Sequence, residues 1–153
     1  MGSLNLINGL QLSDTKIIEN DNGNILRILR NDDIGFYGFG EAYISTIKYN
    51  SIKAWKKHHL MTSNLIVPIG LIKVVVYDDR VNSPTQNLIN EFIIGPSNYK
   101  RITIPPNLYY GFAGLSKNLN HLVNISNITH DINEQESINI LDFKIQYNNW
   151  LNK

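Results

Sequence analysis

Short apolar runs separated by turn residues dominate this chain, and apolar positions at helical spacing are scarce. The runs are rich in β-branched and aromatic residues, and Gly, Pro and Asn stand between them, which favours strands. The predicted strands span residues 25–30, 42–46, 51–59, 64–67, 71–77, 91–94, 101–104, 110–115 and 122–128. Many short strands with frequent turns predict an all-β sandwich or barrel.

The segments between these strands carry signals of their own. The sequence VPIG at 67–70 predicts a tight hairpin turn with Gly70 in the positive-φ conformation. Residues 82–88 predict a surface loop, because Pro84 does not fit a central strand. Short helical segments are predicted at 97–99 and 134–141.

Length and charge restrict the class of protein. A chain of 153 residues suits a single domain over residues 1–153. A net charge of +1 without a basic run argues against nucleic-acid binding, and the lack of cysteine excludes disulfides and thiolate metal sites. The chain has no apolar run of about eighteen residues and no signal-peptide pattern, so we expect a cytoplasmic protein without a membrane segment.

A series of motifs follows in a fixed order along the middle of the chain. They are Lys56 with His59, a turn at Gly70, Asp78 with Arg80, Ser83-Pro84-Thr85, and Pro105-Pro106. This order resembles the sugar-nucleotide epimerases of the cupin superfamily, dTDP-4-dehydrorhamnose 3,5-epimerase above all. The resemblance covers roughly residues 54–136, and the combined order and spacing are more specific than any one motif.

The resemblance implies a fold and an activity. The implied fold is an all-β cupin jelly roll, a double-stranded β-helix, in a homodimer. The implied function is epimerisation or ketoisomerisation of a nucleotide-linked 4-keto-deoxysugar in surface polysaccharide or lipopolysaccharide biosynthesis, without a cofactor. In the family, a histidine removes the proton next to the keto group and a basic residue stabilises the enolate.

The catalytic candidates lie on the predicted strand 51–59. The resemblance points to His59 as the base, with Lys56 or Lys57 as the partner of the enolate or the diphosphate. His58 competes with His59, because adjacent residues on a strand face opposite sides and only one of them enters a pocket. Tyr110 stands where the family has a histidine, and is a candidate substitute acid or a core aromatic.

Two features of the family are absent from the sequence. The segment LVNISNITHD at 122–131 has no tyrosine, whereas the family has there the acid that protonates the opposite ring face. The C-terminal aspartate that orients the family's histidine also has no counterpart. The first absence predicts a single epimerisation or an isomerisation, and the second requires another partner for the histidine.

The substrate-binding candidates each have a structural alternative. Arg80 and Arg101 could bind a diphosphate bidentately, but Arg80 could equally pair with Asp78 or Asp79. Aromatic and amide side chains complete the predicted set: Trp55, Tyr109 and Asn64. Large aromatic side chains in a small β-protein are commonly core residues.

Two other functions compete with catalysis by enolisation. One is a non-catalytic sugar-nucleotide-binding or accessory cupin. The other is a metal-dependent cupin, since neutral imidazoles at strand spacing bind divalent ions. The metal hypothesis is the weaker of the two, because Lys57 and Met61 occupy the positions two residues from His59.

Overall fold

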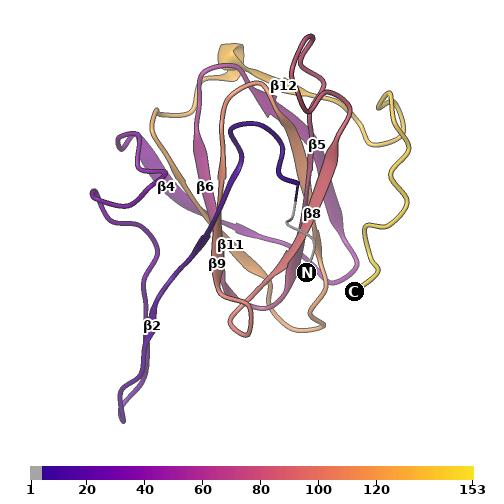
Figure 1. Ribbon diagram of the computed structural model, residues 1–153. Coiled ribbons are helices and arrows are strands. Elements are labelled where there is room, and N and C mark those ends of the chain that lie inside the picture. Colours follow the sequence, from indigo (N-terminus) through magenta and orange to yellow (C-terminus); the bar gives the residue numbers. More distant parts are fainter. Residues whose placement is uncertain (1–4) are drawn as a thin grey trace.

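Two five-stranded antiparallel sheets face each other in the computed structural model, which describes residues 5–153 (Figure 1). The strands are β1 (Gln11–Asp14), β2 (Ile17–Ile18), β3 (Ile25–Leu26), β4 (Glu41–Thr46), β5 (Ile52–His58), β6 (Ser63–Ile69), β7 (Ile72–Tyr77), β8 (Ile89–Ile94), β9 (Lys100–Ile104), β10 (Tyr109–Gly114), β11 (His121–Ser126) and β12 (Gln135–Ser137). A single turn of 3-10 helix, η1 (Ile132–Glu134), precedes β12.

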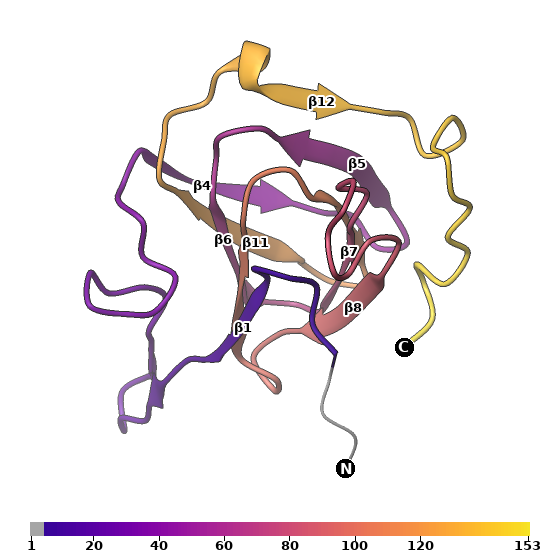
Figure 2. The ribbon, with the colours of Figure 1, turned by 45° about the horizontal axis from the view of Figure 1, so that its top comes forward.

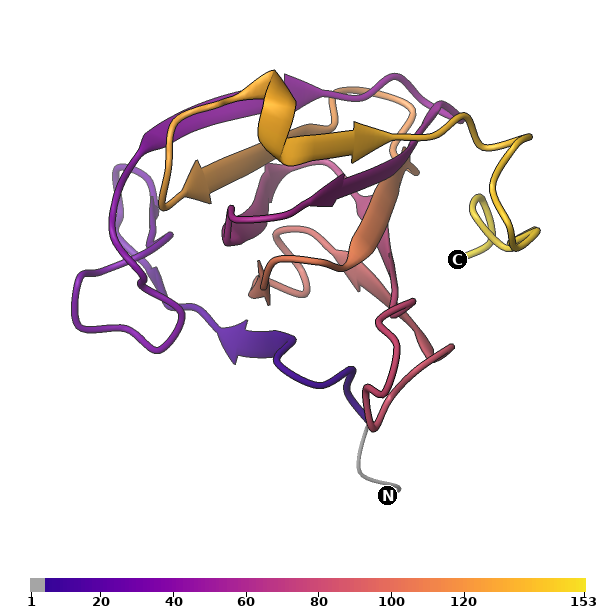
Figure 3. The same ribbon diagram turned by 90° about the horizontal axis from the view of Figure 1, so that it is seen from above.

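Strands adjacent in sequence mostly belong to different sheets. The first sheet has the order β1-β9-β6-β11-β4, and the second has the order β12-β5-β10-β7-β8. Figure 3 shows the same strands from above, with the C-terminal segment along one side of the molecule. This arrangement is a jelly roll, so the predicted all-β cupin class is confirmed.

The predominantly apolar sequence of β7 follows from burial on both faces. The inner faces of the sheets form one core that includes Leu65, Val74 and Leu122. The outer face of the second sheet is covered by residues 138–153, which run alongside it (Figure 2) and bury Phe143 and Trp150. A strand covered on both faces has no solvent side, so its hydrophobic pattern does not alternate.

The turn at 67–70 is present, but it does not form a hairpin. Gly70 has a φ of +88°, and a Cβ atom there would lie 2.1 Å from the carbonyl oxygen of Leu119. β6 and β7, on either side of the turn, pair with different neighbours and belong to opposite sheets. Gly70 therefore takes the chain from one sheet to the other.

Both predicted helices are wrong. Residues 97–99 form part of a turn in which Gly95 and Asn98 bridge, and residues 135–137 form β12, which pairs with β5. An edge position beside β5 stabilises the extended form there, because the sheet supplies the hydrogen bonds that a helix would make internally. Tertiary pairing has overridden a weak local preference.

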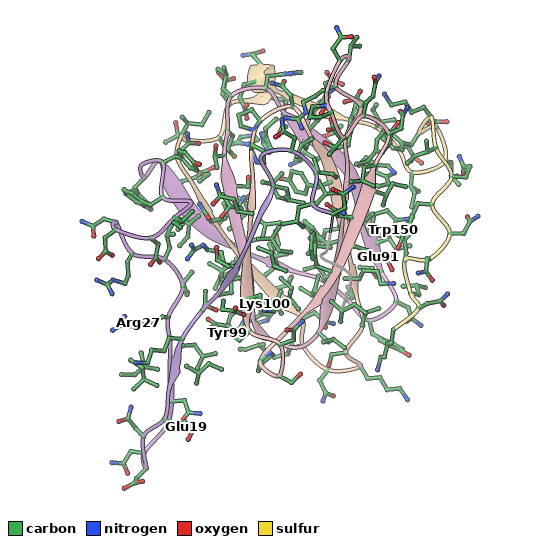
Figure 4. The ribbon with its side chains drawn as sticks, in the orientation of Figure 1. Glu19, Arg27, Glu91, Tyr99, Lys100 and Trp150 are labelled. Atoms are coloured by element: carbon green, nitrogen blue, oxygen red, sulfur yellow. The ribbon has the colours of Figure 1, made fainter. Side chains whose placement is uncertain are left out.

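The N-terminal part of the chain departs most from the predicted strands. The predicted strand at 25–30 extends only over Ile25–Leu26, and it pairs with β2 in a ribbon that projects from the body of the molecule (Figure 1). Glu19 and Arg27 lie on this arm, far from Glu91 and Trp150 on the opposite side (Figure 4). Within residues 5–153, no helix has the length and apolarity needed to cross a bilayer.

Candidate active site

A cavity of about 820 Å³ lies between the two sheets. The first sheet lines it with residues from β4 and β11, and the second with residues from β5, β10 and β12. Its polar wall includes Glu41, Tyr43 and Asn124 on one side and Lys56, Tyr110 and Ser137 on the other, with His130 from the connection after β11. A concave site with a few convergent polar groups is typical of a small-molecule pocket.

The alternation of β5 decides which of its side chains reach this cavity. Lys56 lines it, and His58 stacks on Tyr110 of its lining, with 4% of its surface exposed. Lys57 and His59 point to the opposite face of the strand, where they pair with Asp79 and Glu136. The two adjacent histidines therefore lie on opposite faces of the strand, and His58 is the buried one.

His58 forms a buried dyad with Glu134 of the η1 turn. The imidazole Nδ1 bonds to Oε1 of the carboxylate, and the other oxygen accepts backbone N–H groups of His59, Leu60 and Met61 at 3.0–3.2 Å. The 3-10 turn and β12 hold Glu134 against the end of β5. The histidine therefore has a carboxylate partner, although the sequence offered no C-terminal aspartate for it.

The charge state of the dyad follows from its surroundings. Burial lowers the pKa of the His58 imidazole below its ordinary value, despite the opposing effect of Glu134. Burial raises the pKa of Glu134, but the Leu60 and Met61 N–H groups and His58 outweigh it, and the net pKa is lowered. At neutral pH the pair is a neutral imidazole that donates Nδ1–H to a carboxylate. Its Nε2 atom is then a free acceptor, and it is buried without a partner among the described residues.

Tyr110 and Lys56 complete this side of the site. The ring of Tyr110 stacks beside His58, with centroids 6.1 Å apart and planes inclined by 24°. Burial raises the pKa of the Tyr110 phenol, so the phenol holds its proton at neutral pH. In residues 5–153 the Lys56 ammonium makes no ion pair or hydrogen bond, whereas Lys57 contacts both Asp79 and the Tyr109 ring.

His59 lies outside the cavity. Its Nε2 is 3.2 Å from Glu136, and 40% of its side chain is exposed. Tyr109 is also on this outer face, where its hydroxyl donates to Glu136 at 2.6 Å. Trp55 borders the cavity, but its ring stacks on Phe143, with centroids 4.5 Å apart, under the C-terminal segment.

The remaining predicted binding residues make structural contacts away from the cavity. Arg80 binds Asp78 through Nε and Nη2, at 2.8 and 2.9 Å. Arg101 is 2% exposed and donates to the carbonyl oxygens of Ile28 and Ile34. Asn64 donates to the Gly35 carbonyl, so it anchors the loop before β4.

The sequence alone did not identify several residues of the site. These are Glu134, Tyr43, Asn124, Glu41 and His130. Glu134 falls within a predicted helix, and neither Tyr43 nor Asn124 belongs to a catalytic motif, so only strand pairing brings these two to the cavity. Within the described part of the chain, no three His, Asp or Glu side chains gather in a way that could hold a metal ion.

No protein-family model matches the chain. Among solved structures, a dTDP sugar isomerase from Desulfovibrio desulfuricans G20 is 39% identical, with a TM-score of 0.84, over 87% of this chain and 85% of that one. The chain belongs to the cupin sugar-nucleotide epimerase family. As a member of this family it is an enzyme of the isomerase class.

Other members of the family are more distant. A probable low-salt glycan biosynthesis epimerase, Agl13, from Haloferax volcanii is 27% identical over 85% of each chain. The dTDP-4-dehydrorhamnose 3,5-epimerase from Elizabethkingia anophelis NUHP1 shares the fold, with a TM-score of 0.79 and 15% identity, over 97% of this chain and 84% of that one. The chain is therefore a divergent member of the family.

Proposed function

We propose that this protein isomerises a nucleotide-linked 4-keto-deoxysugar by removing the proton next to the keto group, with His58 as the general base. The observation that carries the proposal is the neutral His58 imidazole, held at Nδ1 by Glu134 and without a partner at Nε2. The Desulfovibrio dTDP sugar isomerase and the Haloferax glycan-biosynthesis epimerase support this class of substrate. We place the reaction in the cytoplasm, in surface polysaccharide or lipopolysaccharide biosynthesis.

The first step is enolisation of the sugar. A proton next to a carbonyl is acidic only if the charge that develops on the carbonyl oxygen is stabilised. His58 takes the proton on Nε2 and becomes an imidazolium, which the Glu134 carboxylate stabilises. Lys56 lies two residues earlier on the same face of β5, and its unpaired ammonium is available to the enolate oxygen.

Proton NMR in heavy water with dTDP-4-keto-6-deoxyglucose tests this function. The wild-type protein is expected to exchange the proton at C3 or C5 for deuterium. His58→Asn is expected to slow this exchange by about 10²- to 10⁴-fold, the usual contribution of a general base. The control His59→Asn is expected to retain it, because His59 is outside the cavity.

The outcomes separate the alternatives. Exchange abolished by His59→Asn and retained by His58→Asn would return the role of base to His59. Wild-type protein that binds the substrate, seen as line broadening, but exchanges no proton would overturn enolisation. Neither binding nor exchange would overturn the substrate class.

Transfer of the keto group to a neighbouring carbon is a second candidate function. The observation in its favour is the position of Tyr110, which lies on β10 next to β5 and stacks on His58. A proton returned from this sheet would reach the same face of the sugar as the base. If this proton is delivered to C4 of the enediol and the C3 hydroxyl loses its proton, C3 becomes the carbonyl and the product is a ketoisomer. The carbon-bound proton pattern would identify this product in the same NMR experiment.

We also propose that the protein is a homodimer. β4 is an edge strand, with no second neighbour in its sheet. Large apolar side chains before and on this strand are exposed, with Phe39 at 68% and Ile44 at 61%. An apolar patch beside an open sheet edge favours association. Analytical ultracentrifugation at micromolar concentration is expected to give twice the mass of the chain, and a monomer there would contradict the proposal.

A further inference from the structure

The first-sheet wall of the cavity, opposite Lys56 and Tyr110, carries a second phenol. Tyr43 lies on β4 and Asn124 on β11, and the two residues are direct partners in the antiparallel register of these strands. Both line the cavity, and both belong to the first sheet, whereas His58 and Lys56 belong to the second. A sugar ring between the sheets would therefore have His58 on one side and Tyr43 on the other.

The hydrogen bonds of Tyr43 leave its proton available. The Asn124 side-chain amide donates to the Tyr43 hydroxyl oxygen at 2.7 Å. Within residues 5–153, no acceptor is bonded to the proton of that hydroxyl. Since 39% of Tyr43 is exposed and the residue lines the cavity, the free O–H group is accessible to a ligand there.

The chemistry of this phenol suits a proton donor. Burial raises the pKa of Tyr43 above its ordinary value, although the Asn124 hydrogen bond acts in the opposite direction. The phenol is therefore protonated at neutral pH. An enolate carbon is basic enough to take this proton, and the Asn124 N–H that already points at the oxygen would stabilise the resulting phenolate.

We propose that Tyr43 is the acid that protonates the enolate on the face opposite His58, with Asn124 as its positioning residue, so that the enzyme inverts a stereocentre. This inference rests on the proposed function and deepens it. His58 takes the C–H proton on one face, and the electron pair moves into the enolate. The Tyr43 O–H proton then forms the new C–H bond on the other face. The imidazolium loses its proton to solvent and the phenolate regains one, so the net reaction is an isomerisation without an oxidant.

The location of Tyr43 separates it from Tyr110. Tyr110 lies on β10 of the second sheet, the same sheet as His58. A proton from Tyr110 would return to the face from which the base removed it. Only a donor on the first sheet can couple enolisation to inversion, and Tyr43 is the phenol that lines the cavity from that sheet.

The test compares deuterium exchange with inversion in the same NMR experiment, using dTDP-4-keto-6-deoxyglucose in heavy water. Tyr43→Phe is expected to form the inverted product at least about 10²-fold more slowly than wild type. It is expected to continue exchanging the substrate proton with retained configuration, because His58 can return a deuteron to the same face. Tyr49→Phe, an exposed tyrosine outside this cavity, is the matched control and is expected to behave as wild type.

Two further variants make the test specific. Tyr110→Phe is expected to keep the ratio of inversion to exchange. Asn124→Leu is expected to lower this ratio in the same direction as Tyr43→Phe, whereas simple loss of folded protein would lower both rates together. A positioning role therefore has a signature that a purely structural role lacks.

Several results would overturn the proposal. Inversion by Tyr43→Phe at the wild-type rate would do so, as would loss of inversion in Tyr110→Phe alone. Loss of both exchange and inversion in Tyr43→Phe, with substrate binding intact, would place Tyr43 in the enolisation step instead. A wild-type protein without any exchange would refute the proposed function itself. This outcome is distinct from failure of the Tyr43 assignment alone, in which the wild-type protein still exchanges the proton.

Discussion

Two buried carboxylates, Asp78 and Glu134, each accept several hydrogen bonds, but the two clusters differ in their relation to the cavity. Asp78 is fully buried, and its oxygens accept from the Arg80 backbone and guanidinium and from the hydroxyls of Ser83 and Thr85. Glu134 is also buried and also saturated, but its partner His58 retains one unpaired nitrogen. The first cluster does not line the cavity, whereas the second has an unpaired nitrogen next to the cavity-lining Tyr110.

The difference shows how to distinguish a structural ion pair from a candidate catalytic one. Both clusters perturb the pKa of their members, and Asp78 is held well below its usual pKa by Arg80, Ser83 and Thr85 although burial opposes this. A perturbed pKa alone would therefore mark both as sites. The unpaired atom and the adjacent cavity distinguish His58–Glu134, because catalysis requires a group that can still form a bond with the substrate.

Asp78→Asn gives the largest expected effect on stability. The substitution leaves the Arg80 guanidinium without its charge partner and removes acceptors from the loop hydroxyls, so the free energy of unfolding should fall by about 3–5 kcal/mol. Urea unfolding followed by circular dichroism measures this. Asp79→Asn is the matched control, because its carboxylate is partly exposed and pairs only with lysines, and its cost should be about 1 kcal/mol or less. Equal costs for the two variants would contradict the structural role of Asp78.

Lys56→Gln tests the unpaired ammonium on the cavity side of β5. Loss of the ammonium should slow deuterium exchange into the substrate by about 10²- to 10³-fold, the usual effect of removing one donor to a developing oxyanion. Lys57→Gln serves as control, because its ammonium is already paired with Asp79 and stacked 4.2 Å from the Tyr109 ring centroid. We expect this variant to be slightly less stable than wild type and to exchange the substrate proton at the wild-type rate. A larger catalytic loss in Lys57→Gln would mean that the wrong face of β5 has been assigned.

Glu134→Gln tests the orientation and charge of the dyad. A neutral amide can still accept from Nδ1, but it stabilises the imidazolium less, so the exchange rate should fall by about 10²-fold. The cost in stability should be about 1–3 kcal/mol, because the carboxylate also accepts three backbone N–H groups. Glu136→Gln, on the outer face with His59, should leave the exchange rate unchanged. Full activity in Glu134→Gln would show that His58 needs no carboxylate.

The pH dependence of activity and folding should separate the two clusters. His58 acts as a base only when neutral, and its pKa is lowered, so kcat/KM should remain level to below pH 6.5. It should then fall about tenfold per pH unit. Asp78 has a lowered pKa in the folded state, so its stabilisation is present above its unfolded pKa and is lost as the pH falls below about 4. Activity and unfolding measured over the same pH series therefore report on His58 and Asp78 separately.

Glu134→Gln sharpens this measurement. Removing the anionic neighbour removes an influence that raises the pKa of His58, so the acidic limb of the profile should move to lower pH. A limb above pH 6.5 in the wild-type protein, or a shift to higher pH in the variant, would contradict the assignment of His58 as a base buried in the neutral form.

The strand pattern could be predicted from the sequence because it depends on local composition. Three consecutive valines stand at 74–76, and Gly70 is required where the chain passes close to Leu119. The predicted helix over 134–141 failed because pairing with β5 provides hydrogen bonds that local propensity does not register. Which of His58 and His59 is buried could not be read from the sequence, because a one-residue change in register reverses every side chain of a strand.

By itself, the sequence determined the all-β class, the jelly-roll resemblance, the family and the presence of a basic and imidazole-rich strand at 53–59. Those properties follow from the order of residue types along the chain. Only the tertiary structure decided that His58 is buried while His59 lies outside the cavity, that Glu134 binds the His58 imidazole, and that Tyr43 lines the cavity from the sheet opposite Lys56. These relations join residues up to 76 positions apart, and such contacts are set by strand pairing and packing rather than by local sequence.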